Sequence, residues 1–227
     1  MFKHSNKYPI YDIEAVTTPE GRRYEVPGGN IYESVTTALG KRSGKKEGLA
    51  EWRKRVGMKE ANRISQLTSK RGTAVHKIIE GYLNNEDTHM WGFMPDAIAM
   101  FKSVQEILNE YVDIIYLQEA PLFSHTYKLA GRTDMIGYWV NHASEKWAQP
   151  ALSVVDFKTS MKPKKEEWLT DYFLQGTAYA KMFEEMYHTE IEQIVLVIAV
   201  ENDTPQIFID SPYKYTGNEF FTERLRK

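Results

Sequence analysis

The 227-residue chain contains no cysteine. Disulfide bonds and thiolate zinc sites are therefore excluded, and so is an iron–sulfur cluster held by cysteine.

Long apolar runs are also missing. No stretch of 18 apolar residues occurs, so we expect no membrane span. The first ten residues have no apolar core of a signal peptide, and acidic residues at 12, 14, 20 and 25 argue against a mitochondrial presequence. We expect a cytoplasmic protein of a bacterial or phage-infected cell. Hydrophobic residues make up 42% of the chain, which is sufficient for one packed domain over residues 1–227.

Net charge is low, at −2, but it is unevenly distributed. Residues 1–75 carry 15 basic and 8 acidic residues, whereas the remaining 152 carry 14 and 23. Within the first part, the stretch 39–75 holds 11 basic residues against 3 acidic ones. A basic segment that attracts phosphate beside an acidic part that holds cations is the division expected of a nuclease; an ordinary solvated helical surface is the alternative.

Periodicity predicts an α/β domain with a mixed central β-sheet flanked by helices. The N-terminal part, residues 1–70, has a hairpin over 11–26, a loop at 27–30, a helix from about 37 that Ser34 or Thr36 could cap, and a basic helical segment. The segment 40–46 resembles a phosphate-binding loop, but its glycine spacing is one residue short and Lys46 replaces the required Ser or Thr. No nucleotide cofactor is expected. The predicted helices are 47–56, 59–67, 72–83, 96–111 and 166–186, and the predicted strands are 112–120, 121–128, 129–140, 152–158, 191–201 and 206–210.

The triplet Asp156-Phe157-Lys158 ends an apolar strand over residues 152–155. Because strand side chains alternate, Asp156 and Lys158 project together while Phe157 points into the core. Charges at the end of a buried strand are costly unless they pair or bind a metal. Asp134 closes a second strand-like run 22 residues earlier. Two carboxylates and a fixed cation suit Mg²⁺-assisted cleavage of a phosphodiester.

Three further features accompany this triplet. A basic exit loop follows Lys158 and suits phosphate oxygens. Gln175 and Tyr179 lie four residues apart and so share one face of the next helix. Upstream, His76 on a helix could supply a third metal ligand, with Glu80 one turn further on.

With these residues, the chain resembles the PD-(D/E)XK nuclease superfamily in its RecB-type branch, and specifically the mitochondrial genome maintenance exonuclease and related phage and bacterial exonucleases. The resemblance implies a restriction-endonuclease-like core over 71–227 and a basic helical arch over 37–70. It also implies one or two Mg²⁺ or Mn²⁺ ions. Thr133 occupies the place of the family's proline, a departure common in this branch. The implied metal ligands are His76, Asp134, Asp156 and the backbone carbonyl of Phe157, and the implied catalytic group is Lys158.

The resemblance further implies a DNA substrate, single-stranded and with a free end. No motor motif is present, so duplex unwinding requires a separate helicase, and a single-strand-binding protein is another candidate partner. Trp52, Trp91 and Trp168 could stack on bases but are interpreted as core residues. A structure-specific endonuclease and a non-catalytic DNA-binding module remain open as alternatives. The catalytic candidates are Lys158, Asp156, Asp134, Gln175 and Tyr179, and the DNA-binding candidates are Ser34, Thr36, Lys41, Arg42, Lys45, Lys46, Arg71, Arg132, Thr159 and Ser160.

Overall fold

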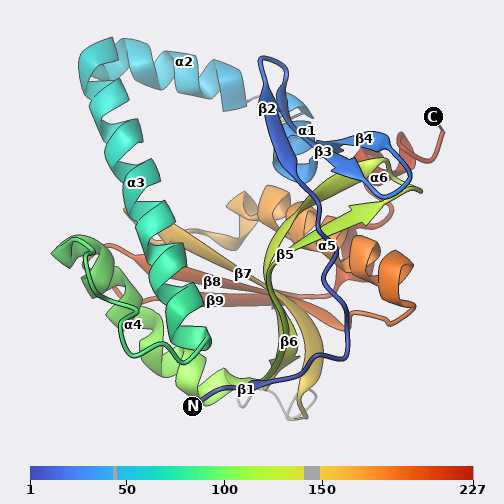
Figure 1. Cartoon of the computed structure of the whole chain (residues 1–227). Coiled ribbons are helices and arrows are strands. Elements are labelled where there is room, and N and C mark those ends of the chain that lie inside the picture. Colours follow the sequence, from blue (N-terminus) through green and yellow to red (C-terminus); the bar gives the residue numbers. More distant parts are fainter. Residues whose placement is uncertain (43–44, 141–148, 227) are drawn as a thin grey trace.

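The computed structural model describes residues 1–42, 45–140 and 149–226 (Figure 1). Its helices are α1 Val35–Arg42, α2 Lys45–Val56, α3 Met58–Leu83, α4 Pro95–Tyr111, α5 Thr170–Tyr187 and α6 Glu219–Thr222, with 3₁₀ turns at Glu166–Trp168 and Pro212–Tyr215. Its strands are β1 Lys3–His4, β2 Ala15–Thr18, β3 Gly21–Val26, β4 Asn30–Ser34, β5 Val112–Ser124, β6 Leu129–Trp139, β7 Ala151–Ser160, β8 Gln193–Val200 and β9 Gln206–Asp210.

The described strands form one mixed sheet in the order β2-β3-β4-β6-β7-β8-β9, with β5 on the other edge of β6 and β1 beside β5. The pairs β4–β6, β7–β8 and β1–β5 are parallel, and the others are antiparallel. Every residue of β8 is buried, as expected for a central strand covered on both faces. The predicted mixed α/β fold is confirmed.

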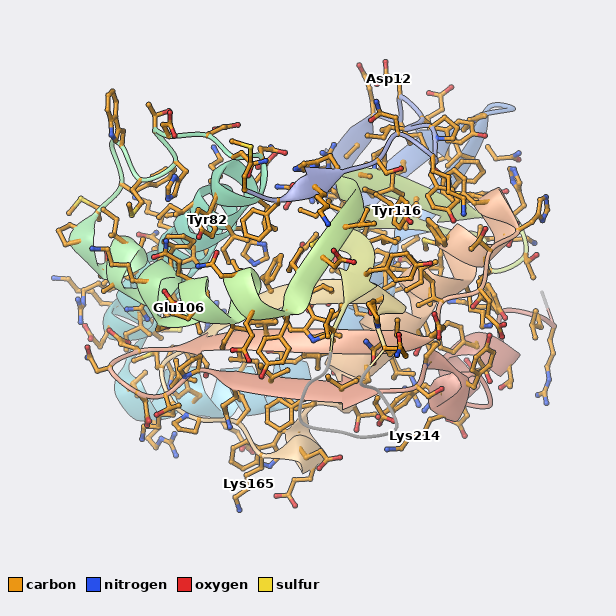
Figure 2. All side chains as sticks on the ribbon, turned by 90° about the horizontal axis from the view of Figure 1, so that it is seen from below. Asp12, Tyr82, Glu106, Tyr116, Lys165 and Lys214 are labelled. Carbon is orange, nitrogen blue, oxygen red and sulfur yellow. The ribbon has the colours of Figure 1, made fainter. Side chains whose placement is uncertain are left out.

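Helices cover both faces of this sheet. On one face, α3 and α4 pack their apolar sides against Val155, Phe157 and Val197. On the other face, α5 packs against Val154 and Ile194. The view from below looks onto α4, whose outer side carries Glu106 (Figure 2). Both faces of β7 are thereby covered, so charged groups on β7 are largely removed from bulk water.

The N-terminal hairpin was predicted and is confirmed by the β2–β3 pairing. The Oγ atom of Ser34 accepts a hydrogen bond of 3.1 Å from the Thr37 backbone N–H, so Ser34 caps α1. Residues 30–34, however, form a strand that joins the sheet through a short parallel pairing with β6. Residues 30–33 also pair antiparallel with β3 across the loop at 27–29, and the prediction missed β4 because its sequence does not alternate clearly.

Two predicted element boundaries are wrong. Helices expected at 59–67 and 72–83 are one helix, α3, because Gly72 is accommodated within it. Strands expected at 112–120 and 121–128 are one strand, β5, which continues through Pro121. The α2 helix and the first half of α3 stand away from the sheet and form an elbow, which we call the α2–α3 elbow (Figure 1). No helix in the described residues is long and apolar enough to span a bilayer.

Candidate active site

Strands β4 and β7 pair with different parts of the same edge of β6, and a short stretch of that edge between them is not paired. Strand β6 pairs with β4 at residues 129–130 and with β7 at residues 135–139, which leaves residues 131–134 as an opening between the two ladders. Asp134 lies at the end of this opening. Its Oδ2 atom accepts a hydrogen bond of 2.8 Å from the backbone N–H of Phe157, so a side chain continues the β6–β7 ladder where main-chain pairing stops.

On the other side of β6, the sheet places a second carboxylate beside Asp134. Gln118 lies opposite Met135 and Ala120 opposite Thr133, so Glu119 is the residue across from Asp134. Glu119 has a φ of 46°, in the left-handed region that non-glycine residues rarely occupy. Such conformations concentrate at functional sites. Like charges directly opposite each other on neighbouring strands are destabilising, which a cation between them would relieve.

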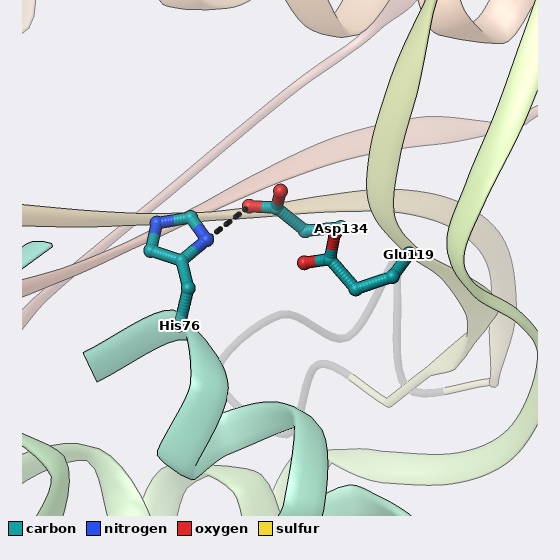
Figure 3. A group of neighbouring side chains, drawn as sticks. All are labelled: His76, Glu119 and Asp134. Carbon is teal, nitrogen blue, oxygen red and sulfur yellow. Dashed lines mark ion pairs between the residues drawn. The ribbon is translucent and has the colours of Figure 1, made fainter. Parts of the chain in front are cut away.

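His76 completes this group from α3. Its Nδ1 atom lies 3.5 Å from Asp134 Oδ2, and ligand atoms of His76, Glu119 and Asp134 all lie within 4.8 Å of one another (Figure 3). Gly72 allows α3 to approach β7 at this point: a Cβ atom added there would lie 3.3 Å from Thr159 Oγ1. His76, one turn further along α3, is thereby brought to the opening in the sheet.

Asp156 and Lys158 form an ion pair on β7 next to this group. The Asp156 side chain is 2% exposed, and the Lys158 ammonium also lies 5.4 Å from the centroid of the Tyr172 ring on α5. Val155 pairs with Met135, so Asp156 follows at the level of Asp134. Three adjacent strands therefore carry Glu119, Asp134 and Asp156 at one level of the sheet.

The electrostatics of this cluster show unbalanced negative charge. Burial, followed by the charges of Asp134 and Glu80, raises the pKa of Glu119 to about 7. Burial raises the pKa of Asp156 to about 6, and Lys158 opposes that rise only in part. Burial also disfavours ionisation of Asp134, but His76 leads the interactions that outweigh it and hold the pKa of Asp134 below its usual value.

The two cationic partners show the opposite balance. Burial disfavours the charged form of Lys158, but Asp156 and Asp134 outweigh it and raise the pKa of the ammonium group. Burial likewise disfavours the charged form of His76, but the hydrogen bond to Asp134 and the charge of Asp134 outweigh it and raise the pKa of the imidazole.

These residues fit a divalent cation of the Mg²⁺ or Mn²⁺ type. The donor set is one imidazole with carboxylate oxygens, which suits those ions. Asp156 Oδ2 is buried and contacts the Lys158 ammonium, so this carboxylate would be shared between the lysine and a cation. The Phe157 N–H points toward β6, and the carbonyl of the same strand residue points to the same edge. The predicted carbonyl ligand would therefore face the opening.

Gln175 and Tyr179 lie on α5 behind the opening. Gln175 Nε2 donates a hydrogen bond of 3.3 Å to the Tyr179 hydroxyl, and Tyr179 is 3% exposed. Burial raises the pKa of Tyr179 far above its usual value, so this hydroxyl stays protonated. A Cβ atom added to Gly131 would lie 2.8 Å from Tyr179 Cε1, so the Tyr179 ring packs directly on the β6 backbone where the strand opens.

The predicted DNA-binding residues lie in different settings. Arg71 forms a bidentate pair with Glu201, at 2.6 and 2.9 Å, and is largely buried. Lys41 pairs with Glu33 at 2.5 Å, and Arg42 lies 3.8 Å from Glu219. The others are Ser34, buried as a helix cap; Thr36, exposed; Arg132, exposed and bonded to the Glu119 carbonyl; Thr159, half-buried; Ser160, bonded to the Lys162 carbonyl; and Lys45 and Lys46, whose side chains lie outside the described residues.

Glu119 is the site residue that sequence reasoning missed. It lies in a strand-like run with no charged motif around it, and only the pairing of β5 with β6 brings it to Asp134. The interpretation of two tryptophans was also wrong: Trp168 is 58% exposed and Trp91 76% exposed, so neither is a core residue. Trp52 is half-buried.

Comparison with known proteins leaves the family open. No family model and no curated protein matches the sequence. Among solved structures, the chain is similar to a protein from Eubacterium rectale named "Putative exonuclease", at 10% identity and a TM-score of 0.40 over 69% of this chain and 62% of that one. It is also similar to a protein named SSO0001, at 13% identity and a TM-score of 0.33 over 68% and 73%. Neither likeness is close enough to establish a family, so the site geometry carries the functional assignment.

Proposed function

We propose that this protein is a divalent-metal-dependent deoxyribonuclease of the PD-(D/E)XK type, which hydrolyses phosphodiester bonds from the free end of single-stranded DNA. The observation that carries the proposal is the row of carboxylates on β5, β6 and β7, with His76 on one side and Lys158 on the other. Hard anionic ligands and a largely buried lysine within one opening of a sheet suit metal-assisted cleavage of a phosphodiester.

The residues that would hold the metal are His76, Asp134, Asp156 and the Phe157 carbonyl, with Glu119 as an additional ligand. When bound, Mg²⁺ or Mn²⁺ supplies a Lewis acid that activates water and neutralises charge on the phosphate. This is the role that the resemblance to RecB-type nucleases implies, and the clustered carboxylates support it.

The side chains of the protein then position the remaining charges. Lys158 is held by Asp156, so its ammonium can stabilise the negative charge that develops on the phosphate oxygens in the transition state. Burial of this pair strengthens that interaction, because the surroundings screen it less than water would. The amide of Gln175 and the protonated hydroxyl of Tyr179 can donate hydrogen bonds to the phosphate or to water beside it.

The basic N-terminal third would guide the strand to this site. In this proposal residues 1–70 and 71–227 belong to one nuclease domain, with the α2–α3 elbow acting as the arch over the substrate. Duplex DNA would have to be opened by a separate helicase. A structure-specific endonuclease is the rival within enzymes, and a DNA-binding module without activity is the rival outside them.

Linear and circular single strands distinguish these functions. We expect wild-type protein to degrade end-labelled linear single-stranded DNA with Mg²⁺, to leave a circular strand intact and to be inactive with chelator. Lys158→Ala should lower the rate by on the order of 10²–10³ or more, since it removes a transition-state contact. Cleavage of the circle would indicate the endonuclease, and DNA binding without cleavage of either substrate would indicate the binding module.

A further inference from the structure

Trp168 is exposed although the chain around it is anchored. Its side chain is 58% exposed, whereas the next residue, Leu169, is completely buried. The backbone N–H groups of Trp168 and Leu169 donate hydrogen bonds of 3.0 Å to the carbonyls of Lys165 and Glu166, which closes a 3₁₀ turn. The indole is therefore held outward by fixed backbone.

The loop that leads to Trp168 from β7 is also fixed. Lys164 donates its backbone N–H to Gln206 Oε1 at 2.7 Å, and Gln206 Nε2 donates to the Lys164 carbonyl at 3.0 Å. Closer to the active site, the Ser160 hydroxyl donates to the Lys162 carbonyl at 2.6 Å. An aromatic side chain on a loop that hydrogen bonds already hold in place loses little conformational entropy when a ligand covers it.

Lysines precede this indole in the loop, and one of them lies over its ring. The Lys165 ammonium lies 5.4 Å from the centroid of the Trp168 ring, and the side chain of Lys165 projects from the edge of the molecule (Figure 2). Lys162 is exposed and Lys164 half-buried on the same loop. Glu166 and Glu167 are the acidic residues here, and Glu167 lies 3.8 Å from Lys165. An exposed aromatic ring among lysines is the combination that binds single-stranded nucleic acid.

Trp168 is also close to the catalytic lysine along the chain. Tyr172, whose ring lies 5.4 Å from the Lys158 ammonium, follows Trp168 by four residues. Trp168 ends the 3₁₀ turn that leads directly into α5, so the exposed indole and the residue that contacts Lys158 belong to one continuous, hydrogen-bonded stretch of chain.

We propose that Trp168 is a stacking platform for an unpaired base of the DNA strand, next to the nucleotide being cleaved, with Lys162 and Lys165 binding the flanking phosphates. This inference rests on the proposed function and adds a reason for selecting single strands: a base in a duplex is covered on both faces by its neighbours and is unavailable to the indole. The platform belongs to the loop after β7, apart from the α2–α3 elbow.

Binding without cleavage tests the platform. With chelator present, we expect Trp168→Ala to weaken the affinity for an oligo(dT) single strand by about 5- to 150-fold, the range found for one base–aromatic stack. Trp168→Phe should retain part of that affinity, and Trp168→Ala should leave duplex affinity unchanged. Trp91→Ala is the matched control, because Trp91 is also exposed, at 76%, but lies in the segment between α3 and α4. It should bind as wild type does.

A strand with abasic sites separates stacking from charge. Wild type should bind an abasic strand more weakly than oligo(dT), whereas Trp168→Ala should bind the two alike. If Trp168→Ala loses the same affinity for the abasic strand as for oligo(dT), the platform is overturned. It is also overturned if Trp168→Ala binds oligo(dT) as wild type does while still degrading single strands, and in both cases the proposed function stands. If wild type neither binds nor degrades single-stranded DNA in Mg²⁺, the proposed function itself is overturned.

Discussion

Among the individual residues, the Asp156–Lys158 pair is the one whose presence is explained least by a contribution to fold stability. Removing a charge from water costs several kcal/mol, and the attraction within a buried ion pair often does not exceed the cost of desolvating both charges. Apolar residues would serve the strand at least as well, since Val154, Val155 and Phe157 around the pair are buried. Retention of the pair is consistent with a catalytic role for Lys158.

Breaking this pair should therefore destabilise the protein more than replacing it. We expect Lys158→Met to lower the free energy of unfolding by about 1–3 kcal/mol, because Asp156 is left buried without its counter-ion and Lys158 is itself partly exposed. Asp156→Leu combined with Lys158→Met should recover much of this loss. Urea unfolding monitored by circular dichroism measures both.

Arg63→Met provides the control for this comparison. It breaks the exposed Arg63–Glu60 pair on α3 and should leave the free energy of unfolding nearly unchanged, because water screens this pair. A double variant less stable than Lys158→Met would contradict the view that the pair is a cost to the fold.

The sequence predicted only part of this site. Asp134, Asp156, Lys158 and His76 could be selected because each follows an apolar run or occupies a helix at the spacing of a known motif. Glu119 could not, because its position depends on the register of β5 against β6 and on a left-handed backbone conformation. No local pattern encodes either property. The ligand roles of all these residues stay predictions.

At the scale of elements, the strands and helices with a single clear period were predicted within a few residues. Examples are β8, which is apolar from Ile194 to Val200, and α4, which begins with Pro95 at a favoured first-turn position. The errors lie where tertiary contacts override local signals. Gly72 does not break α3, and Pro121 does not end β5. Strand β4 forms a local hairpin with β3, and its two pairs with β6, almost a hundred residues away in the chain, join that hairpin to the sheet.

Gly131 provides a test of how α5 is seated on β6. We expect Gly131→Ala to lower the free energy of unfolding by about 1–3 kcal/mol, because the new methyl group would lie 2.8 Å from the fully packed Tyr179 ring. Gly48→Ala in α2 is the control: it has open space around it and should be neutral or stabilising by up to about 1 kcal/mol. Equal effects of the two substitutions would show that Tyr179 is not packed against β6 as described.

At the scale of the whole molecule, the basic N-terminal third is only partly neutralised. Lys41, Arg42 and Arg71 each have a glutamate partner, so they are less available to phosphate than their charge suggests. In contrast, exposed basic residues of the α2–α3 elbow have no ion pair within the described residues: Lys54, Arg55, Lys59 and Lys70. The elbow is therefore the better candidate for the predicted basic arch.

The salt dependence of DNA binding tests this surface. Changing Lys54, Arg55, Lys59 and Lys70 together to glutamine should reduce the slope of log affinity against log salt by about 0.7 for each side chain that contacts a single strand. A control variant removes the same charge elsewhere, at Lys3, Lys7, Lys102 and Lys214, and should change the slope little. Identical slopes for the two variants would rule out the arch and leave the elbow as an ordinary solvated surface.

The most direct test of the central claim is anomalous diffraction from crystals soaked with Mn²⁺. Occupation of the site by a divalent cation predicts a manganese peak bounded by His76, Glu119 and Asp134, within reach of Asp156 and the Phe157 carbonyl. Asp134→Asn crystals treated in the same way should lose this peak, because the shared carboxylate is removed. Absence of a peak between these residues in wild-type crystals at saturating Mn²⁺, in a protein that still cleaves DNA, would contradict the assignment of this group as the metal site.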